Sequence, residues 1–161
     1  MDATVEPWLD LWDYLDRNFW GFWQWAAAHL TPEQACWQPT QRVASIGWNL
    51  QHLGEMLDHY LSRVFDQGDR VQATPLLTMV PGNLDTGRYR DLQAIALYHQ
   101  KVRPAYRALL ERLTATDLDR RLVGSVRAKT WAWAIGHIAE HESYHLGKCT
   151  LLRNLLPEAR L

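Results

Sequence analysis

The chain has 161 residues, of which 47% are hydrophobic and 22% are charged, so it can form one hydrophobic core, and we expect a single domain over residues 1–161. The formal net charge is -1 and no run of lysine and arginine stands out, which argues against binding to nucleic acid. The first residues are acidic and the longest apolar stretch is too short to span a bilayer, which predicts a soluble cytoplasmic protein without membrane contact. Cys36 and Cys149 lie far apart in sequence, and we expect reduced thiols rather than a disulfide.

The first expected helix runs from about residue 7 to about residue 29. Pro7 suits a first helical turn, and the helical pattern stops before Thr31 and Pro32. Apolar residues recur at helical spacing and mark a core face: Trp8, Trp12, Leu15, Phe19 and Phe22 or Trp23. The apolar residues outside this face are Leu9, Trp20 and Trp25. This surplus apolar surface predicts a homodimer, and aromatic crowding inside the bundle is the alternative.

Three further helices are expected, over about residues 45–66, 88–113 and 130–156. Ser45 has the chemistry of an N-cap for the first of these three, and Pro104 predicts a kink or a break in the next. Because no stretch alternates over the length of a strand, the sequence predicts an all-α four-helix bundle.

The connection between the second and third helices is about twenty residues long and rich in Gly, Pro and Thr. Twenty extended residues reach about 66 Å, which exceeds the length of a helix of about 30 to 40 Å. These two helices can therefore run parallel, and we expect an up-down-down-up bundle with a long crossover between helices 2 and 3.

The segment HIAEHESYH, residues 137–145, places a histidine at every fourth position, at His137, His141 and His145. Residues at this spacing lie about 40° apart around a helix and about 6 Å apart along it, so two imidazoles can share one metal ion. The alternative is that these histidines are half-buried polar groups on an amphipathic helix. A pair at this spacing favours the metal.

A third ligand should come from a neighbouring helix, and the second helix offers His52 and His59. His52 lies on an apolar face, where a buried polar group needs a partner. Two histidines at i and i+4 with one from a neighbour form a three-nitrogen site with an open position, which suits Zn, Ni or another divalent ion. We expect His29 and His99, which lie on other helices, to be structural.

The segment HESYH, residues 141–145, also matches the H-E-x-x-H motif of metalloproteases. Its surroundings disfavour a protease, because no strand is evident and Lys148 stands where the extended motif carries another histidine nearby. Glu142 remains a candidate general base, and a solvent-facing carboxylate is the alternative. Lys148 lies on the histidine stripe, where it either steadies an anionic substrate group or packs its stem and extends its ammonium group to solvent.

The segments SIGWNLQHLGEM and GHIAEHESYHLGK resemble those of the DinB-like and YfiT-like four-helix-bundle metalloproteins. The shared features are a serine followed seven residues later by a histidine, and spaced histidines followed by a glycine in the last helix. The resemblance covers nearly the whole chain. It implies that His52, His141 and His145 bind a divalent metal, that His137 occupies a position where the family often has an extra histidine, and that the protein is a dimer. The family's Arg-Gly-Gln ending is replaced here by residues 146–148, Leu-Gly-Lys, which keeps the ligands but not a substrate preference.

Several relatives in that family are S-transferases that use bacillithiol, mycothiol or glutathione, and others are isomerases or hydrolases. The resemblance therefore favours a metal-dependent transferase or hydrolase that activates a low-molecular-weight thiol or water for a small-molecule substrate. The alternative is a non-catalytic, metal-stabilised bundle that serves as a stress-response or interaction module. An open coordination position would favour the enzyme, and a fourth protein ligand such as Glu55 would favour the alternative. The candidate catalytic residues are His137, Glu142 and Lys148.

Overall fold

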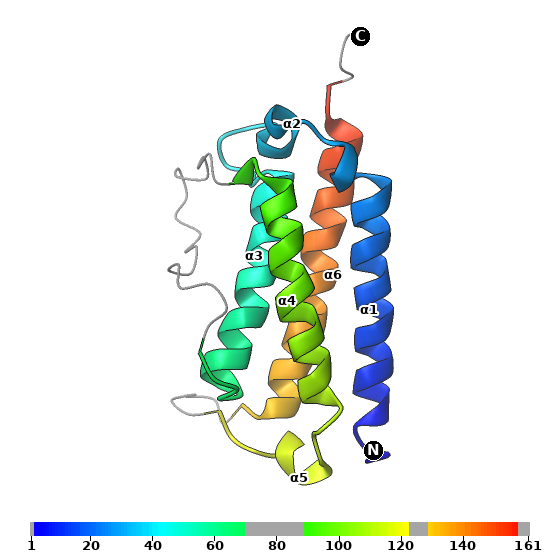
Figure 1. Ribbon diagram of the computed structural model, residues 1–161, viewed down its shortest axis with the longest axis vertical. Helices are drawn as coiled ribbons and strands as arrows, with labels where there is room; N and C mark the ends of the chain where they lie inside the picture. Colours follow the sequence, from blue (N-terminus) through cyan, green and yellow to red (C-terminus); the bar gives the residue numbers. More distant parts are fainter. Residues whose placement is uncertain (1, 70–88, 123–128, 158–161) are drawn as a thin grey trace.

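The computed structural model describes residues 2–69, 89–122 and 129–157, and four long helices lie side by side in it (Figure 1). The regular elements of these residues are all helical, so the prediction of an all-α chain is confirmed for the described part. The long helices are α1 (Glu6–Trp25), α3 (Ile46–His59), α4 (Leu92–Leu110) and α6 (Trp131–Leu155). The short elements are η1 (Ala27–His29), α2 (Pro32–Cys36), a π-helical turn η2 (Tyr60–Val64) and α5 (Ala115–Leu118).

Side-chain caps set the starts of three long helices. The Ser45 hydroxyl accepts a hydrogen bond from the backbone N–H of Trp48 at 3.2 Å, as expected for the N-cap of α3. Asp91 and Thr130 cap α4 and α6 in the same way. The cap at Asp91 explains why α4 begins later than the hydrophobic pattern predicts.

α4 continues through Pro104 as one helix, so the expected break is absent. A proline removes one backbone hydrogen bond and crowds the preceding turn. The residues beside it, Val102, Arg103 and Tyr106, are all buried in the bundle. Tertiary packing on both sides of the proline therefore holds the helix together.

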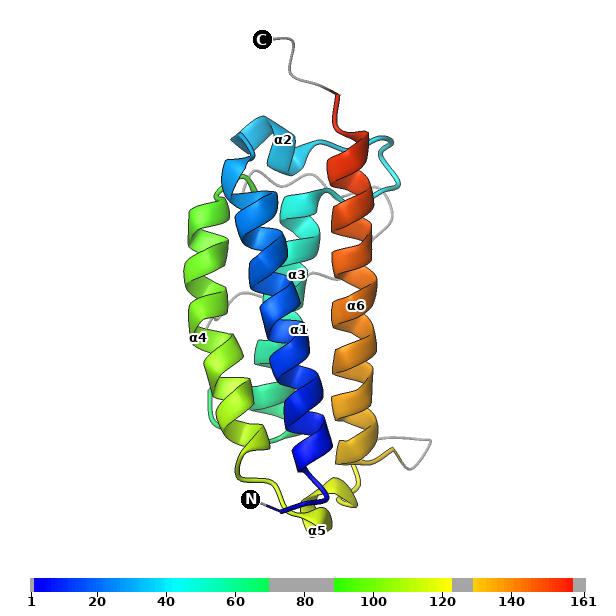
Figure 2. The same cartoon turned by 90° about the vertical axis from the view of Figure 1, so that its right-hand side faces the viewer.

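The contacts between helices define their directions. Gly47 approaches Tyr89, and Gly54, farther along α3, approaches Tyr98, so α3 and the start of α4 advance together. The colours of Figure 1 show the same, with α3 and α4 running down and α1 and α6 running up. Figure 2 shows α1 between α4 and α6 with α3 behind it. The connection between α3 and α4, expected to be a crossover, includes residues 70–88, which lie outside the described residues.

The three apolar residues of α1 that lie outside the predicted core face differ in how deeply they are buried. Leu9 is buried in the core, and Trp20 is half-buried against the hydrophobic cluster around Phe19. The sequence prediction that both contribute surplus surface is wrong, because α1 contacts α4 and α6 at once and buries a wider arc than one stripe. Trp25 remains 58% exposed.

The close approach of α3 to α4 depends on Gly54. A Cβ atom at this position would lie 2.8 Å from the Tyr98 ring and 3.2 Å from Nε2 of His99. The His99 ring is fully buried, and its Nε2 lies 2.8 Å from the Leu50 carbonyl oxygen, to which it can donate. This agrees with a structural role for His99.

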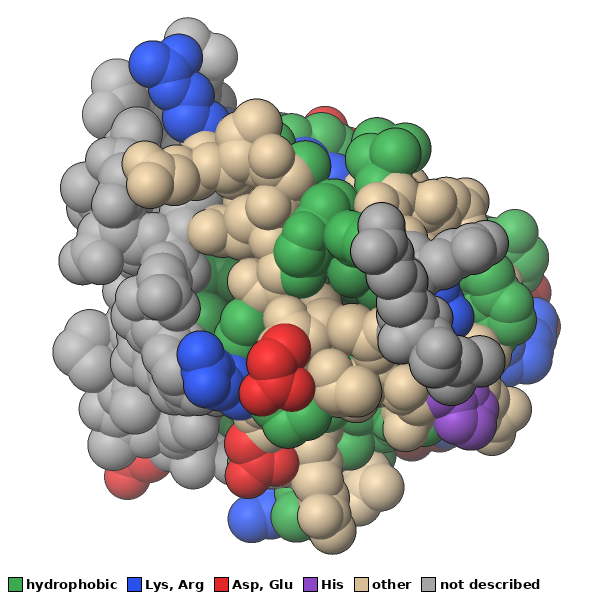
Figure 3. Space-filling model, turned by 90° about the horizontal axis from the view of Figure 1, so that it is seen from above, with side chains coloured by type: hydrophobic (Ala, Val, Ile, Leu, Met, Phe, Trp, Pro, Cys, Tyr) green, Lys and Arg blue, Asp and Glu red, His purple; other side chains and the backbone are tan. Residues whose placement is uncertain are grey.

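The bundle end that carries α2 and the last turns of α6 exposes several hydrophobic side chains (Figure 3).

Both cysteines are free thiols, with Cys149 buried and Cys36 half-buried. Within the described residues, no helix combines the length and the apolar character needed to cross a membrane.

Candidate metal centre

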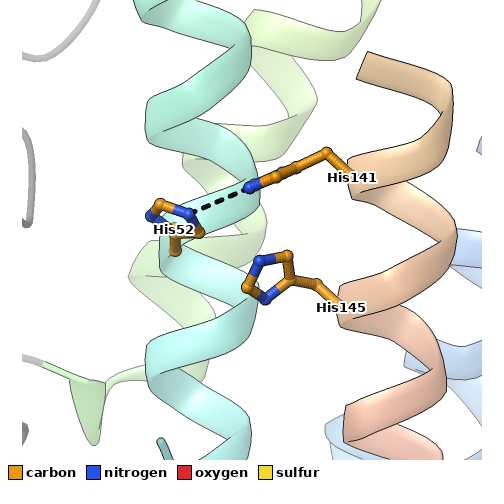
Figure 4. Close-up of side chains that lie close together, drawn as sticks. All are labelled: His52, His141 and His145. Atoms are coloured by element: carbon orange, nitrogen blue, oxygen red, sulfur yellow. Dashed lines mark hydrogen bonds between the residues drawn. The ribbon is translucent and has the colours of Figure 1, made fainter. Parts of the chain in front are cut away.

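His52 of α3 and His141 and His145 of α6 turn their rings toward one another (Figure 4). One nitrogen from each ring lies within 4.8 Å of the others, and the Nε2 atoms of His52 and His141 are 3.2 Å apart. Two imidazole nitrogens bound to one tetrahedral ion at about 2.0 to 2.1 Å would lie about 3.3 to 3.4 Å apart. The spacing of His52 and His141 therefore suits two ligands of one ion.

The Trp48 ring positions His52. It lies one turn earlier on α3, is buried, and stacks on the His52 ring with centroids 4.6 Å apart and an interplanar angle of 19°. The same tryptophan lies 6.1 Å from the His145 ring, measured between centroids. A rigid aromatic wall thus limits the orientations that these two imidazoles can adopt.

Asn49 fixes the orientation of His145. The His145 Nδ1–H donates to Oδ1 of Asn49 at 2.6 Å, while the Asn49 amide nitrogen donates to the carbonyl oxygens of Ser45 at 2.7 Å and Ala44 at 3.2 Å. Because both backbone partners are acceptors, the amide must present its oxygen to the imidazole. This leaves the lone pair of His145 Nε2 directed into the cluster, as a metal ligand requires.

Burial keeps the three imidazoles neutral at pH 7. It lowers the pKa of His52 and of His141 to about 4 and that of His145 to about 3. Positive charge on neighbouring histidines and on Lys148 lowers the three pKa values further, and the Glu140 carboxylate opposes this shift at His141. Neutral imidazole is the form that binds a metal.

The donor set fits a divalent ion. Three neutral imidazoles converge, and the two facing Nε2 atoms can share only one proton between them, so unpaired electron pairs remain inside the cluster. Glu55 is not a member of the cluster, and its carboxylate accepts a hydrogen bond from Gln51 at 3.0 Å. Nitrogen donors of this kind suit Zn and Ni.

His137 lies beside the cluster rather than in it. Its ring stacks on Trp133 with centroids 4.9 Å apart, its Nδ1 is 3.3 Å from the Glu140 carboxylate, and its centroid is 5.9 Å from that of His141. It is half-buried. His137 therefore lines the approach to His141 and is not one of the three converging donors.

Glu142 points into the bundle and pairs with Arg103 of α4. The Arg103 guanidinium lies 2.5 Å from the Glu142 carboxylate and 2.5 Å from the Asp16 carboxylate of α1. Glu142 is only 1% exposed, so the alternative of a solvent-facing carboxylate is wrong. Burial raises the pKa of Glu142, and the positive charge of Arg103 opposes this shift.

Arg103 was not among the candidate residues predicted from the sequence. A usable signal was present, because Arg103 sits beside Val102 in a helix whose apolar face is clear, and a buried arginine requires an acidic partner. The partner, Glu142, is on another helix.

Lys148 lies one turn after His145 on α6 and is half-buried. Its Nζ is 4.0 Å from the centroid of the Tyr144 ring, an arrangement that favours a cation. It has no carboxylate partner among the described residues. The ammonium group is therefore available to an anion near the histidine cluster.

These features define an all-helical bundle protein with three histidines placed to bind one metal ion. A family model for the DinB superfamily matches residues 18–149, and the chain belongs to this superfamily. The DinB-like resemblance of its motifs is thereby confirmed. A conserved protein from Enterococcus faecalis of known crystal structure shares the fold, with a TM-score of 0.73 and 16% identity over 97% of this chain and 98% of that chain. No match was found among curated proteins.

Proposed function

We propose that this protein is a metal-dependent enzyme in which His52, His141 and His145 hold a divalent ion, Zn or Ni, that activates a thiol or water. The observation that carries the proposal is the convergence of three neutral imidazole nitrogens within 4.8 Å, in a group that includes no fourth His, Cys, Asp or Glu of the described residues. A bound ion would supply Lewis acidity, which lowers the pKa of a thiol or water in the remaining position. The substrate would be a small molecule.

The surrounding residues have separate roles in this proposal. Asn49 holds His145 in the ligating tautomer, and Trp48 shields the cluster from water on the α3 side. His141, the least buried of the three, faces the approach that His137 lines, where His137 can accept a proton from the incoming group. We assign no acid–base role to Glu142, because its carboxylate is held by Arg103.

The test combines metal analysis with turnover. Purified protein should contain about one divalent ion per chain, and His141→Ala should lose it because a two-histidine site binds far more weakly. His137→Ala is the matched control, since it removes a histidine of the same helix outside the converging group, and it should keep the ion. Full retention of the ion by His141→Ala would refute the site.

Turnover is measured with low-molecular-weight thiols and a chromogenic electrophile such as 1-chloro-2,4-dinitrobenzene. We expect thiol consumption to depend on the ion and to vanish in His141→Ala. One ion per chain without turnover in a broad screen of thiols, electrophiles and esters would favour the alternative of a metal-stabilised, non-catalytic bundle. That alternative draws support from the burial of His52 and His145 between α3 and α6, where an ion would tie the two helices together.

We also propose the up-down-down-up connectivity, in which the segment 70–88 is the crossover. The parallel order of contacts along α3 and the start of α4 supports it. A homodimer is proposed as well, supported by the exposed Trp25 at the end of α1.

A further inference from the structure

A groove of about 330 Å³ lies between the loop that follows α2 and the last turns of α6. Figure 2 shows this loop beside the end of α6. One wall is apolar, and its leucines belong to α6: Leu151 is 59% exposed and Leu155 is also exposed, while Leu152 is buried. Val43 of the loop lines the groove as well. The volume is at the lower end of the range for small-molecule sites, about 300 to 1,000 Å³.

The charges at this groove all have one sign. Arg42 and Lys148 line it, and no carboxylate does so among the described residues. Neither cation has a carboxylate partner in the described part of the chain. Two cations beside an apolar surface create a positive potential that an organic anion would neutralise.

The groove is joined to the histidine cluster through two connections. Lys148 follows His145 by one turn of α6. Ala44, which lines the groove, accepts a hydrogen bond from the same Asn49 side chain that holds His145. A molecule in the groove would therefore place its charged end next to the cluster.

We propose that this groove binds the hydrocarbon chain of a small monocarboxylate, with the carboxylate against Lys148 and Arg42. The groove then defines the substrate class of the centre, an apolar organic acid, and in this respect the inference rests on the proposed function. A second copy of the chain is a poorer occupant, because a two-fold contact through this groove would bring two pairs of unpaired cations together.

Binding is measured by isothermal titration calorimetry on the purified protein, with octanoate, acetate and octanol as probes. Acetate carries the same acid group and can pair with the same two cations, so any gain of octanoate over acetate reports the groove. We expect octanoate to bind at least about tenfold more tightly than acetate, because each buried CH₂ contributes about 0.8 kcal/mol. Octanol should bind more weakly than octanoate, because it cannot pair with the two cations. Octanoate binding no tighter than acetate binding would overturn the proposal.

Two variants with matched controls locate the binding. Leu151→Asp places a negative charge in the groove and should weaken octanoate binding at least about tenfold. Leu97→Asp, which changes a 53% exposed leucine of α4 outside the groove, should leave it unchanged. Lys148→Gln should weaken octanoate binding and reduce its salt dependence, whereas Lys101→Gln on the exposed side of α4 should do neither. Circular dichroism checks that each variant is folded.

The outcomes separate this inference from the proposed function. If the purified protein neither contains nor takes up a divalent ion, the metal-dependent activity is refuted. Octanoate binding that depends on the groove residues in that protein would still support the anion groove. Equal octanoate affinity in Leu151→Asp and Leu97→Asp would overturn the groove, whatever the metal content. A parent protein that binds no octanoate and changes its oligomeric state in Leu151→Asp would identify the groove as an interface between chains and overturn the proposal.

Discussion

Two of the polar clusters buried among the described residues have opposite character, and one stretch of α6 contributes to both. Toward α3, His141 and His145 meet His52, and the three imidazoles are neutral donors that face one another. Toward α4, Glu142 meets Arg103, whose guanidinium also binds Asp16 of α1. In the second cluster the guanidinium and the two carboxylates bind one another within the protein. In the first, one nitrogen from each of three neutral rings lies within 4.8 Å of the others, and no carboxylate or cysteine of the described residues joins the group.

This difference divides the HESYH segment between structure and function. Glu142 lies about 100° around the helix from His141 and about 60° from His145, so it faces a different neighbour. In a metalloprotease the same glutamate would act on a metal-bound water. Here it is held by Arg103, so the histidines of the motif and its glutamate serve different clusters.

The largest effect on stability is expected from breaking the ion-paired cluster. Arg103→Ala leaves the Glu142 carboxylate buried without its cation and should lower the free energy of unfolding by about 3 to 5 kcal/mol, measured by urea denaturation. Arg107→Ala is the control, because Arg107 pairs with Asp13 near the surface and should cost about 1 kcal/mol or less.

Glu142→Gln tests, with a smaller perturbation, whether the two clusters are independent. The Glu142→Gln protein should lose less stability than the Arg103→Ala protein, because the amide oxygen can still accept a hydrogen bond from the guanidinium. Its metal content should equal that of the parent. Loss of metal from folded Glu142→Gln would show that the two clusters act as one unit.

Removing the metal should produce the next largest effect. An ion present at 100 times its dissociation constant stabilises the folded chain by about 2.7 kcal/mol. Chelation should therefore lower the melting temperature by about 5 to 10 °C in differential scanning calorimetry. The His137→Ala protein should respond like the parent, and the His141→Ala protein should not respond. Equal melting temperatures of the parent with and without chelator would contradict the assignment.

A smaller effect is expected at Asn49, which orients His145 without contacting the other two histidines in the described hydrogen bonds. Asn49→Leu removes the acceptor for Nδ1–H and should weaken metal binding about 10- to 100-fold in a competition titration. Asn49→Asp keeps an oxygen acceptor and should retain the affinity. Equal weakening in both variants would mean that Asn49 acts through the loop carbonyls it binds, and not through His145.

The histidine cluster was accessible to sequence reasoning because its key feature is local. Residues four apart in one helix share a face whatever the rest of the fold does, so His141 and His145 could be paired from the sequence alone. His52 required the helical wheel and the family resemblance. Their assignment as metal ligands stays a prediction. The all-helical class and the cap at Ser45 also followed from local patterns and are confirmed.

The ion-paired cluster was not accessible in this way. Arg103 and Glu142 come from helices that are separated by a long connection, and local patterns do not fix how far each helix rotates about its own axis. The same limit explains Leu9, which is buried because α1 packs between two helices at once. The break that Pro104 offered as one outcome is absent for a related reason, since the packing that keeps α4 continuous comes from other helices.

The smallest effect on stability is expected at Trp25, which lies outside both clusters at the end of α1 and is 58% exposed. Trp25→Gln should change the free energy of unfolding by about 0.5 kcal/mol or less and leave the metal content unchanged.

If Trp25 lies in a dimer interface, the same substitution should weaken dimerisation, because large aromatic residues dominate such contacts. Light scattering should then show a dimeric parent and a shift toward monomer in Trp25→Gln. Tyr14→Gln, which changes a 57% exposed aromatic residue of the same helix, is the control and should stay dimeric. A parent that is monomeric at micromolar concentration would contradict the homodimer and leave the exposed Trp25 as surface that no partner covers.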